Sequence, residues 1–101
     1  MNGNSIMKNI VMTYALRLEH LLTQKLPELT HYQALIRTSP CKYIEQVLDR
    51  IWAEKSHLHD DIRQFREQYC LGYEKQTLDQ LVENGWNFEE MLLELKYLIE
   101  A

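Results

Sequence analysis

Apolar residues recur along the first quarter of the chain at the alternating steps of three and four that are typical of one helix face. The members of this face are Val11, Ala15, Leu18 and Leu22. Leu26 precedes Pro27, and a residue before proline is disfavoured in the helical conformation. The pattern therefore predicts a helix that begins near Ile6 or Lys8 and ends near Leu26, after a polar segment 1–5 that frays.

Pro27 also fits the first position of a second helix, because the missing N–H would have no helical partner there. Glu28 follows in the first turn, where the positive end of the helix dipole favours an anion. We expect this second helix to end near Arg37. Ser39 before Pro40 repeats the start signal for a third helix.

The most regular pattern in the chain consists of two rows of apolar residues that repeat every seven positions. The first row is Ile44, Ile51, Leu58 and Phe65, and the second is Leu48, Ile62 and Tyr69. Only Lys55 interrupts the second row. Rows offset in this way form the surface along which one helix packs lengthwise on another. We predict one long central helix over about 40–71, ended by Gly72 in the left-handed conformation.

Two start signals follow in the last quarter of the chain. Thr77 with Gln80 forms a capping box for a short helix that Gly85 ends. Asn87 with Glu90 repeats the signal and begins a final helix. The predicted inner face of that helix is Phe88, Met91, Leu92, Leu95 and Ile99.

Composition agrees with a helical protein that has a packed core. Of the 101 residues, 46% are hydrophobic and 26% charged, which is ordinary for a globular domain. Three glycines and two prolines are too few for the turns of an all-β fold of this length. We predict an all-α, single-domain helical bundle over residues 1–101, with about five helices, one of them long and central, and short C-terminal helices.

Neither a membrane nor an oxidising compartment is indicated. The apolar stretch 10–16 is far shorter than the roughly 20 residues that span a bilayer, and no cleavage signal follows it. We therefore expect a cytoplasmic protein without a membrane partner.

Cys41 and Cys70 lie 29 positions apart in the sequence. On one helix they would be roughly 40 Å apart, too far for a disulfide, so we expect two thiols.

Motifs for catalysis are absent from the sequence. It has no nucleophile elbow, no glycine-rich phosphate loop and no paired cysteine motif, so we expect no enzyme and no cofactor. The alternative is a metal-binding or enzymatic bundle built on Glu54, His57 and Asp61, which would share one arc of the long helix. We favour an ordinary solvated surface at these three positions and predict no metal site.

Charge is distributed unevenly. The net charge is −4, and from Glu74 onward seven acidic residues against two basic ones give −5. The region after Thr77 loosely imitates a helix-turn-helix, but its final helix would repel phosphates, so we expect no nucleic-acid partner.

The acidic C-terminal region is instead the predicted site for a partner protein, and its charge favours a basic one. The candidate residues are Trp86, Glu83, Glu90 and Glu94. Trp86 has no place in the helix periodicity, so it is either a contact anchor or a residue that stabilises the turn. The acidic residues could equally be a solubilising face. We predict a non-catalytic protein-binding protein of the small inhibitor, immunity, chaperone or regulatory type, which acts through its helical surface as a homodimer or with a different partner.

Overall fold

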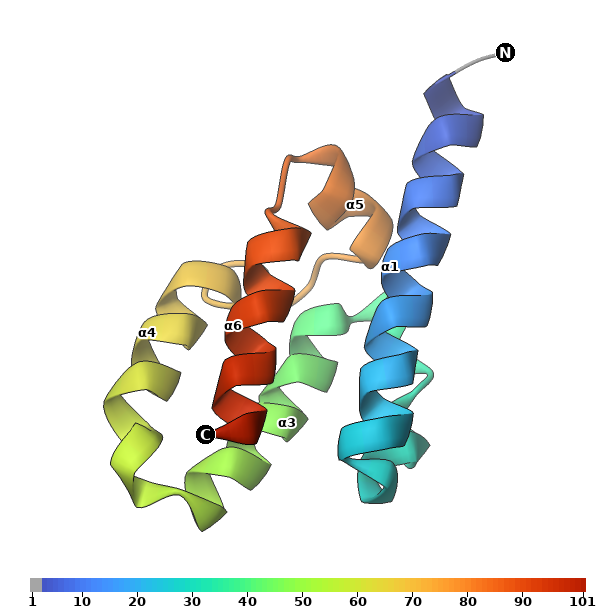
Figure 1. Ribbon diagram of the computed structural model, residues 1–101. Helices are drawn as coiled ribbons and strands as arrows, with labels where there is room; N and C mark the ends of the chain where they lie inside the picture. The colour runs from blue at the N-terminus through green and yellow to red at the C-terminus, as the bar shows by residue number, and fades with distance from the viewer. Residues whose placement is uncertain (1–2) are drawn as a thin grey trace.

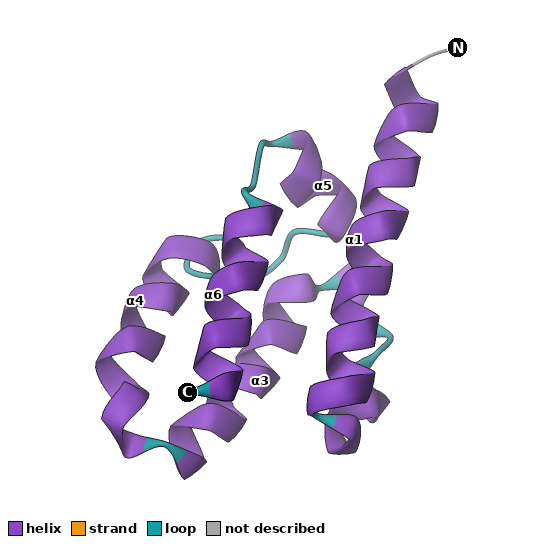
Figure 2. Ribbon diagram, in the orientation of Figure 1, coloured by secondary structure: helices purple, strands orange, loops and turns teal. Residues whose placement is uncertain are grey.

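The computed structural model describes residues 3–101, and all regular secondary structure within them is helical (Figures 1 and 2). This confirms the all-α class. The elements are α1 (Gly3–Lys25), the 3-10 helix η1 (Pro27–Tyr32), α2 (Leu35–Thr38), α3 (Pro40–Glu54), the 3-10 helix η2 (Ser56–Leu58), α4 (His59–Tyr69), α5 (Leu78–Glu83) and α6 (Phe88–Glu100).

Helix α6 occupies the middle of the molecule. It lies between α4 on one side and α1 on the other, with α3 behind it and α5 near its N-terminal end (Figure 1). The helices share one hydrophobic core, to which nearly every element contributes. Its largest fully buried side chains include Tyr43, Phe88 and Leu18. The first turns of α1 project beyond this body (Figure 1).

Helix α1 is longer than its apolar pattern indicates. It begins at Gly3 rather than near Ile6 or Lys8, so the prediction that residues 1–5 fray is wrong for residues 3–5, while residues 1–2 lie outside the described part of the chain. The end at Lys25 agrees with the proline rule. Among residues 3–101, no helix is both long enough and apolar enough to cross a bilayer.

The predicted helix from Pro27 to Arg37 is divided into two short pieces. Residues of η1 form the tighter 3-10 helix, and α2 adds a single α-helical turn after Ala34. Leu29 and Ile36 are the buried residues of these pieces. Two buried residues stabilise a short helix weakly, so the connection to α3 can adopt the path that the core requires.

The predicted long central helix over 40–71 is wrong, because the chain folds back on itself at Lys55. That residue has φ −131° and ψ 80°, outside the helical region, and α4 then runs back alongside α3 (Figure 1). Every residue of the two apolar rows is nevertheless buried. Folding back places both halves of the seven-residue pattern in the same core, whereas a straight helix of this length would extend part of it into solvent.

Two polar contacts hold the turn between α3 and α4. The ring of His59 stacks on Trp52 with 3.5 Å between centroids, and Nε2 lies 2.9 Å from the Trp52 carbonyl oxygen. The ammonium of Lys55 donates to the carbonyl oxygens of Ile99, at 2.6 Å, and Leu98, at 3.3 Å. The Trp52 carbonyl lies in the last turn of α3, and those of Leu98 and Ile99 lie in the last turn of α6, where no helical N–H group is available to donate. Lys55, the residue that interrupts the apolar row, therefore caps the C-terminal end of α6.

The C-terminal helices form as their start signals predict. The hydroxyl of Thr77 accepts from the Gln80 amide and the Gln80 side chain accepts from the Thr77 amide, which completes the capping box. Asn87 caps α6 by accepting from the Glu90 amide, but the second capping box is incomplete, because the Glu90 carboxylate accepts from the Asn87 side chain and not from its backbone N–H. Both predicted glycines are left-handed, with φ +90° at Gly72 and +82° at Gly85. The inner face of α6 differs from the predicted one at a single position, because Leu98 is buried and Ile99 is only partly buried.

The prediction that the two cysteines lie far apart is also wrong. Cys41 is in the first turn of α3 and Cys70 directly follows α4, so the fold-back brings them to the same end of the α3–α4 pair. Both are free thiols and both are buried.

Candidate functional site

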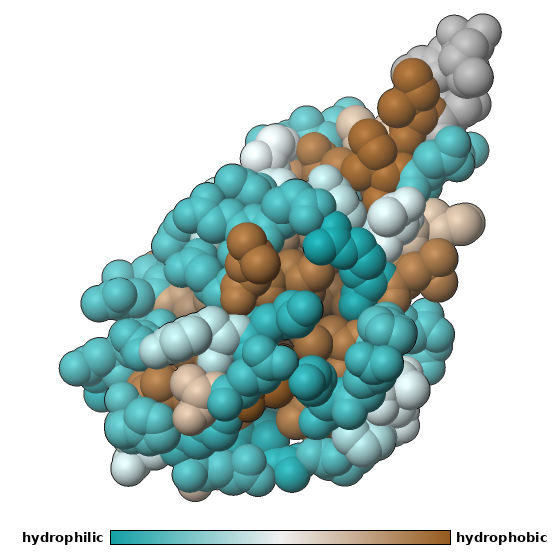
Figure 3. Space-filling view, in the orientation of Figure 1, coloured by the Kyte–Doolittle hydropathy of each residue, from teal (hydrophilic) through white to brown (hydrophobic). Residues whose placement is uncertain are grey.

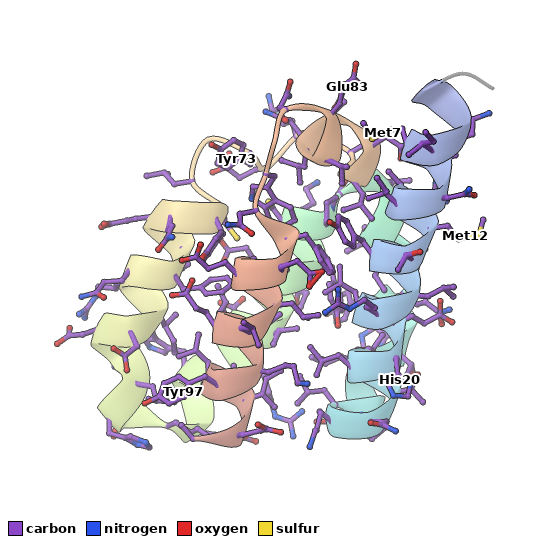
Figure 4. The ribbon with its side chains drawn as sticks, turned by 45° about the horizontal axis from the view of Figure 1, so that its top comes forward. Met7, Met12, His20, Tyr73, Glu83 and Tyr97 are labelled. Carbon is purple, nitrogen blue, oxygen red and sulfur yellow. The ribbon has the colours of Figure 1, made fainter. Side chains whose placement is uncertain are left out.

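The structure brings together three of the four predicted partner-binding residues. Glu90 and Glu94 lie one turn apart on α6, and Trp86 lies directly before its cap. Glu90 shares a hollow of about 220 Å³ with Trp86. Glu83 is separate: it is exposed on α5 and points away from the body of the protein (Figure 4). The candidate surface therefore belongs to α6 rather than to the whole acidic region.

One stripe on α6, exposed except at the partly buried Glu94, combines the acids with large apolar side chains. Its members, at helical spacing, are Glu90, Leu93, Glu94 and Tyr97. Leu93 is 70% exposed and Tyr97 60% exposed, although most large apolar residues of the helix are buried. Tyr97 points toward α4 (Figure 4). We call these four residues the α6 stripe.

A shallow groove of about 280 Å³ separates the α6 stripe from α4. Helix α4 contributes Asp61 and Gln64 to its wall, and α6 contributes Leu93, Glu94 and Tyr97. In the space-filling view, apolar atoms interrupt the otherwise hydrophilic surface over α6 and along α1 (Figure 3). An apolar groove with polar groups along its rim is the usual form of a site that binds a partner side chain.

The carboxylates beside this groove have no cation within the described chain. Asp61, Glu90 and Glu94 form no ion pair with any basic group of residues 3–101. The polar contacts of Glu90 are instead with Asn87, whose amide nitrogen donates to it at 3.0 Å. Asp61 and Glu94 at the groove, with Glu90 one turn away on α6, produce a field that attracts cations. The arrangement is therefore suited to binding positively charged groups.

Glu94 is held in place by Tyr69. The buried Tyr69 ring extends from α4, and its hydroxyl donates to the Glu94 carboxylate. Burial, together with this hydrogen bond, raises the pKa of the Tyr69 hydroxyl well above its usual value. The hydroxyl therefore remains a donor throughout the neutral range and keeps Glu94 as an oriented acceptor at the groove.

Trp86 is half-buried and joins α4 to the start of α6. Its indole N–H donates to the Tyr69 carbonyl oxygen at 3.1 Å, and its ring packs edge-on against Phe88. The carbonyl belongs to the last turn of α4, where no helical donor is available. These contacts favour the role of a turn-stabilising residue over that of an exposed anchor.

No protein-family model, curated protein or solved structure matches this chain.

The alternative metal site loses its structural basis with the long helix. Glu54 ends α3, His57 lies in η2 and Asp61 lies in α4, so the three no longer share one helical arc. Glu54 instead pairs with Arg50, with 2.7 Å between Oε1 and Nε. Within residues 3–101, no group of three histidine, cysteine or acidic side chains is placed to hold a metal ion.

A larger hollow lies on the opposite side of α6, against α1. It measures about 810 Å³ and includes Leu16, Lys25, Lys96 and Glu100 in its wall. Charges of both signs line it, and Lys25 pairs with Glu100 at 3.1 Å. Because the positive and negative charges offset one another, this surface does not have the purely negative field of the groove beside the α6 stripe.

Leu93, Tyr97 and Asp61 were missed from the sequence as partner-binding residues, and Asp61 was considered only as a metal ligand. A signal for the first two was present, because neither apolar residue belongs to the predicted inner face of the last helix. Such residues point to solvent unless another element covers them. Asp61 carried no such signal, since its proximity to α6 depends on the fold-back at Lys55.

Proposed function

We propose that this protein is a non-catalytic binding protein that holds a basic and apolar segment of another protein along the α6 stripe. The observation that carries the proposal is the combination of two exposed large apolar side chains with carboxylates that lack a cation within the described chain. Binding without chemistry is the mode of action of small inhibitors, immunity proteins, chaperones and regulators.

The chemistry of the partner follows from the order of residues along the stripe. Leu93 and Tyr97 are one helical turn apart, about 6 Å along the axis. A partner segment with two apolar residues at that separation can contact both. Lysine or arginine side chains on either flank would then lie beside Glu90 on one edge and Asp61 on the other. Such pairing mainly accelerates association and selects the partner, while the apolar contacts slow dissociation.

Selection from a random peptide library displayed on phage tests this proposal without a known partner. The immobilised wild-type protein should enrich peptides that combine lysine or arginine with paired apolar residues. Binding of the enriched peptides should weaken as salt is added, because the charges at the groove are exposed to screening. Leu93→Ser and Glu90→Lys should each reduce affinity by about tenfold or more.

Two control variants make the same kinds of substitution at exposed positions outside the α6 stripe. Met12→Ser alters an apolar side chain of α1 that is 56% exposed. Asp49→Lys reverses an exposed charge on α3 that forms no ion pair within residues 3–101. Both controls should bind the enriched peptides as the wild type does. Enrichment of acidic peptides, or equal loss in the controls, would contradict the proposal.

A further inference from the structure

The two cysteines form a buried pair that plays no part in the proposed binding surface. Cys41 is 0% exposed and Cys70 is 1% exposed. They lie at the first turn of α3 and immediately after α4, so they mark the two ends of the folded-back helix pair. A link between them would close the whole α3–α4 segment into a loop.

The geometry brings the Cys41 sulfur atom to the backbone next to Cys70. The Cys41 thiol donates to the carbonyl oxygen of Tyr69, with 3.6 Å between Sγ and oxygen. That carbonyl is part of the peptide bond to Cys70, so Cys41 reaches the backbone from which the Cys70 side chain projects. The hydrogen bond between the two thiols raises the pKa of Cys70, and burial raises it further. Cys70 is therefore protonated at neutral pH, and its thiolate, the reactive form, is scarce.

We propose that Cys41 and Cys70 are a dithiol that the folded protein can convert reversibly into an intramolecular disulfide. The oxidant is a small disulfide of the glutathione class. Local opening at the ends of α3 and α4 exposes one of the buried cysteines, and its thiolate attacks the oxidant and displaces a first glutathione thiolate, which leaves a mixed disulfide. The second cysteine attacks that bond and displaces the second glutathione. Two S–H bonds are lost and one S–S bond forms, while the oxidant takes up the two electrons and two protons.

A disulfide here should stabilise the fold rather than distort it. The sequence separation of 29 positions gives a closed loop of the size for which cross-linking restricts the unfolded chain substantially. The loop contains all of α3 and α4, including the turn at Lys55. Since Tyr69 also accepts from Trp86, the link would lie beside the contact that joins α4 to α6. The oxidised protein should therefore keep its helices and melt at a higher temperature.

Equilibration of the wild-type protein with defined ratios of oxidised to reduced glutathione tests the proposal directly. Because the chain has only two cysteines, a monomer that is lighter by two hydrogen atoms and resists alkylation can only contain the Cys41–Cys70 bond. Incubation at about pH 8 and for many hours compensates for the scarcity of thiolate. The oxidised monomer should form under native conditions, return to the dithiol on reduction, and melt roughly 10 °C higher than the reduced form.

Three outcomes would overturn the inference: persistent thiols at every glutathione ratio, stable mixed disulfides with glutathione, or an oxidised monomer that melts below the reduced one. Cys70→Ser is the matched variant, and it should never give the lighter monomer. If that variant does not fold, the mass and melting measurements on the wild type decide the question alone. None of these measurements involves the α6 stripe, so the binding proposal and the disulfide proposal can fail independently.

Discussion

The two sides of α6 carry similar residues in contrasting surroundings. On the side toward α1, Glu89 accepts from Arg17 at 2.5 and 2.7 Å, and Glu100 pairs with Lys25. On the side toward α4, Glu90 and Glu94 have no cation within residues 3–101. The difference comes from the neighbouring helices, because α1 presents basic side chains to α6 and α4 presents Asp61.

Apolar residues show the same contrast. Leu92, toward α1, is 5% exposed, whereas its sequence neighbour Leu93 is 70% exposed. The acidic residues named on the α1 side are thus paired within the protein, whereas the α4 side of α6 combines unpaired carboxylates with uncovered apolar surface. Residue type alone does not identify a binding surface; what identifies it is the lack of an intramolecular partner.

The largest expected effect separates the buried and exposed leucines of α6. Leu95→Ala should lower the free energy of unfolding by about 2 to 5 kcal/mol, because Leu95 is 0% exposed and its removal leaves a cavity. Leu93→Ala should change it by less than about 0.5 kcal/mol. Urea denaturation followed by circular dichroism measures both. A large loss for Leu93→Ala would mean that this residue supports the fold and would remove it from the binding surface.

A second, smaller effect concerns the lysine that caps α6. Lys55→Met should lower the free energy of unfolding by about 1 to 2 kcal/mol, because it leaves the carbonyls of Leu98 and Ile99 without their donor. Lys96→Met, an exposed lysine of α6 without an ion pair in residues 3–101, is the matched control and should have little effect. Hydrogen exchange should show faster opening of the last turn of α6 in the first variant only.

Trp86→Phe should cost about 1 kcal/mol of folding stability, since it keeps an aromatic ring but removes the indole donor to Tyr69. Affinity for the peptides that bind the α6 stripe should stay within about twofold of the wild type. Chemical denaturation and a binding titration on the same variant provide the two numbers. Unchanged stability together with lost affinity would show that Trp86 is a contact anchor instead.

The smallest effect is the pH dependence of the pair between Arg17 and Glu89. The hydrogen bond from Arg17 lowers the pKa of Glu89, so the carboxylate stabilises the folded state above its ordinary pKa of about 4.3. This contribution is lost as the pH falls through the lowered pKa. A double-mutant cycle with Arg17→Gln and Glu89→Gln should show a small coupling in melting temperature near neutral pH that vanishes in acid. Coupling that persists in acid would contradict the ion pair.

Local signals in the sequence determined where most helices start and stop. Pro27 ended the first helix, Thr77 and Asn87 capped α5 and α6, and Gly72 and Gly85 took the left-handed conformation. Each of these outcomes depends on residues within about one turn of each other, so the sequence contains the whole cause. The seven-residue rows likewise identified the buried residues of α3 and α4 correctly.

Only the tertiary structure decided how those rows are used. No proline or glycine marks the turn at Lys55; the turn forms because both halves can then share one core and because Lys55 reaches the end of α6. The same turn brings Cys41 to Cys70 and Asp61 to the α6 stripe. These contacts join residues far apart in the chain, and their energy depends on the position of a third helix. A periodic pattern specifies which side of a helix is buried, but not the element that buries it.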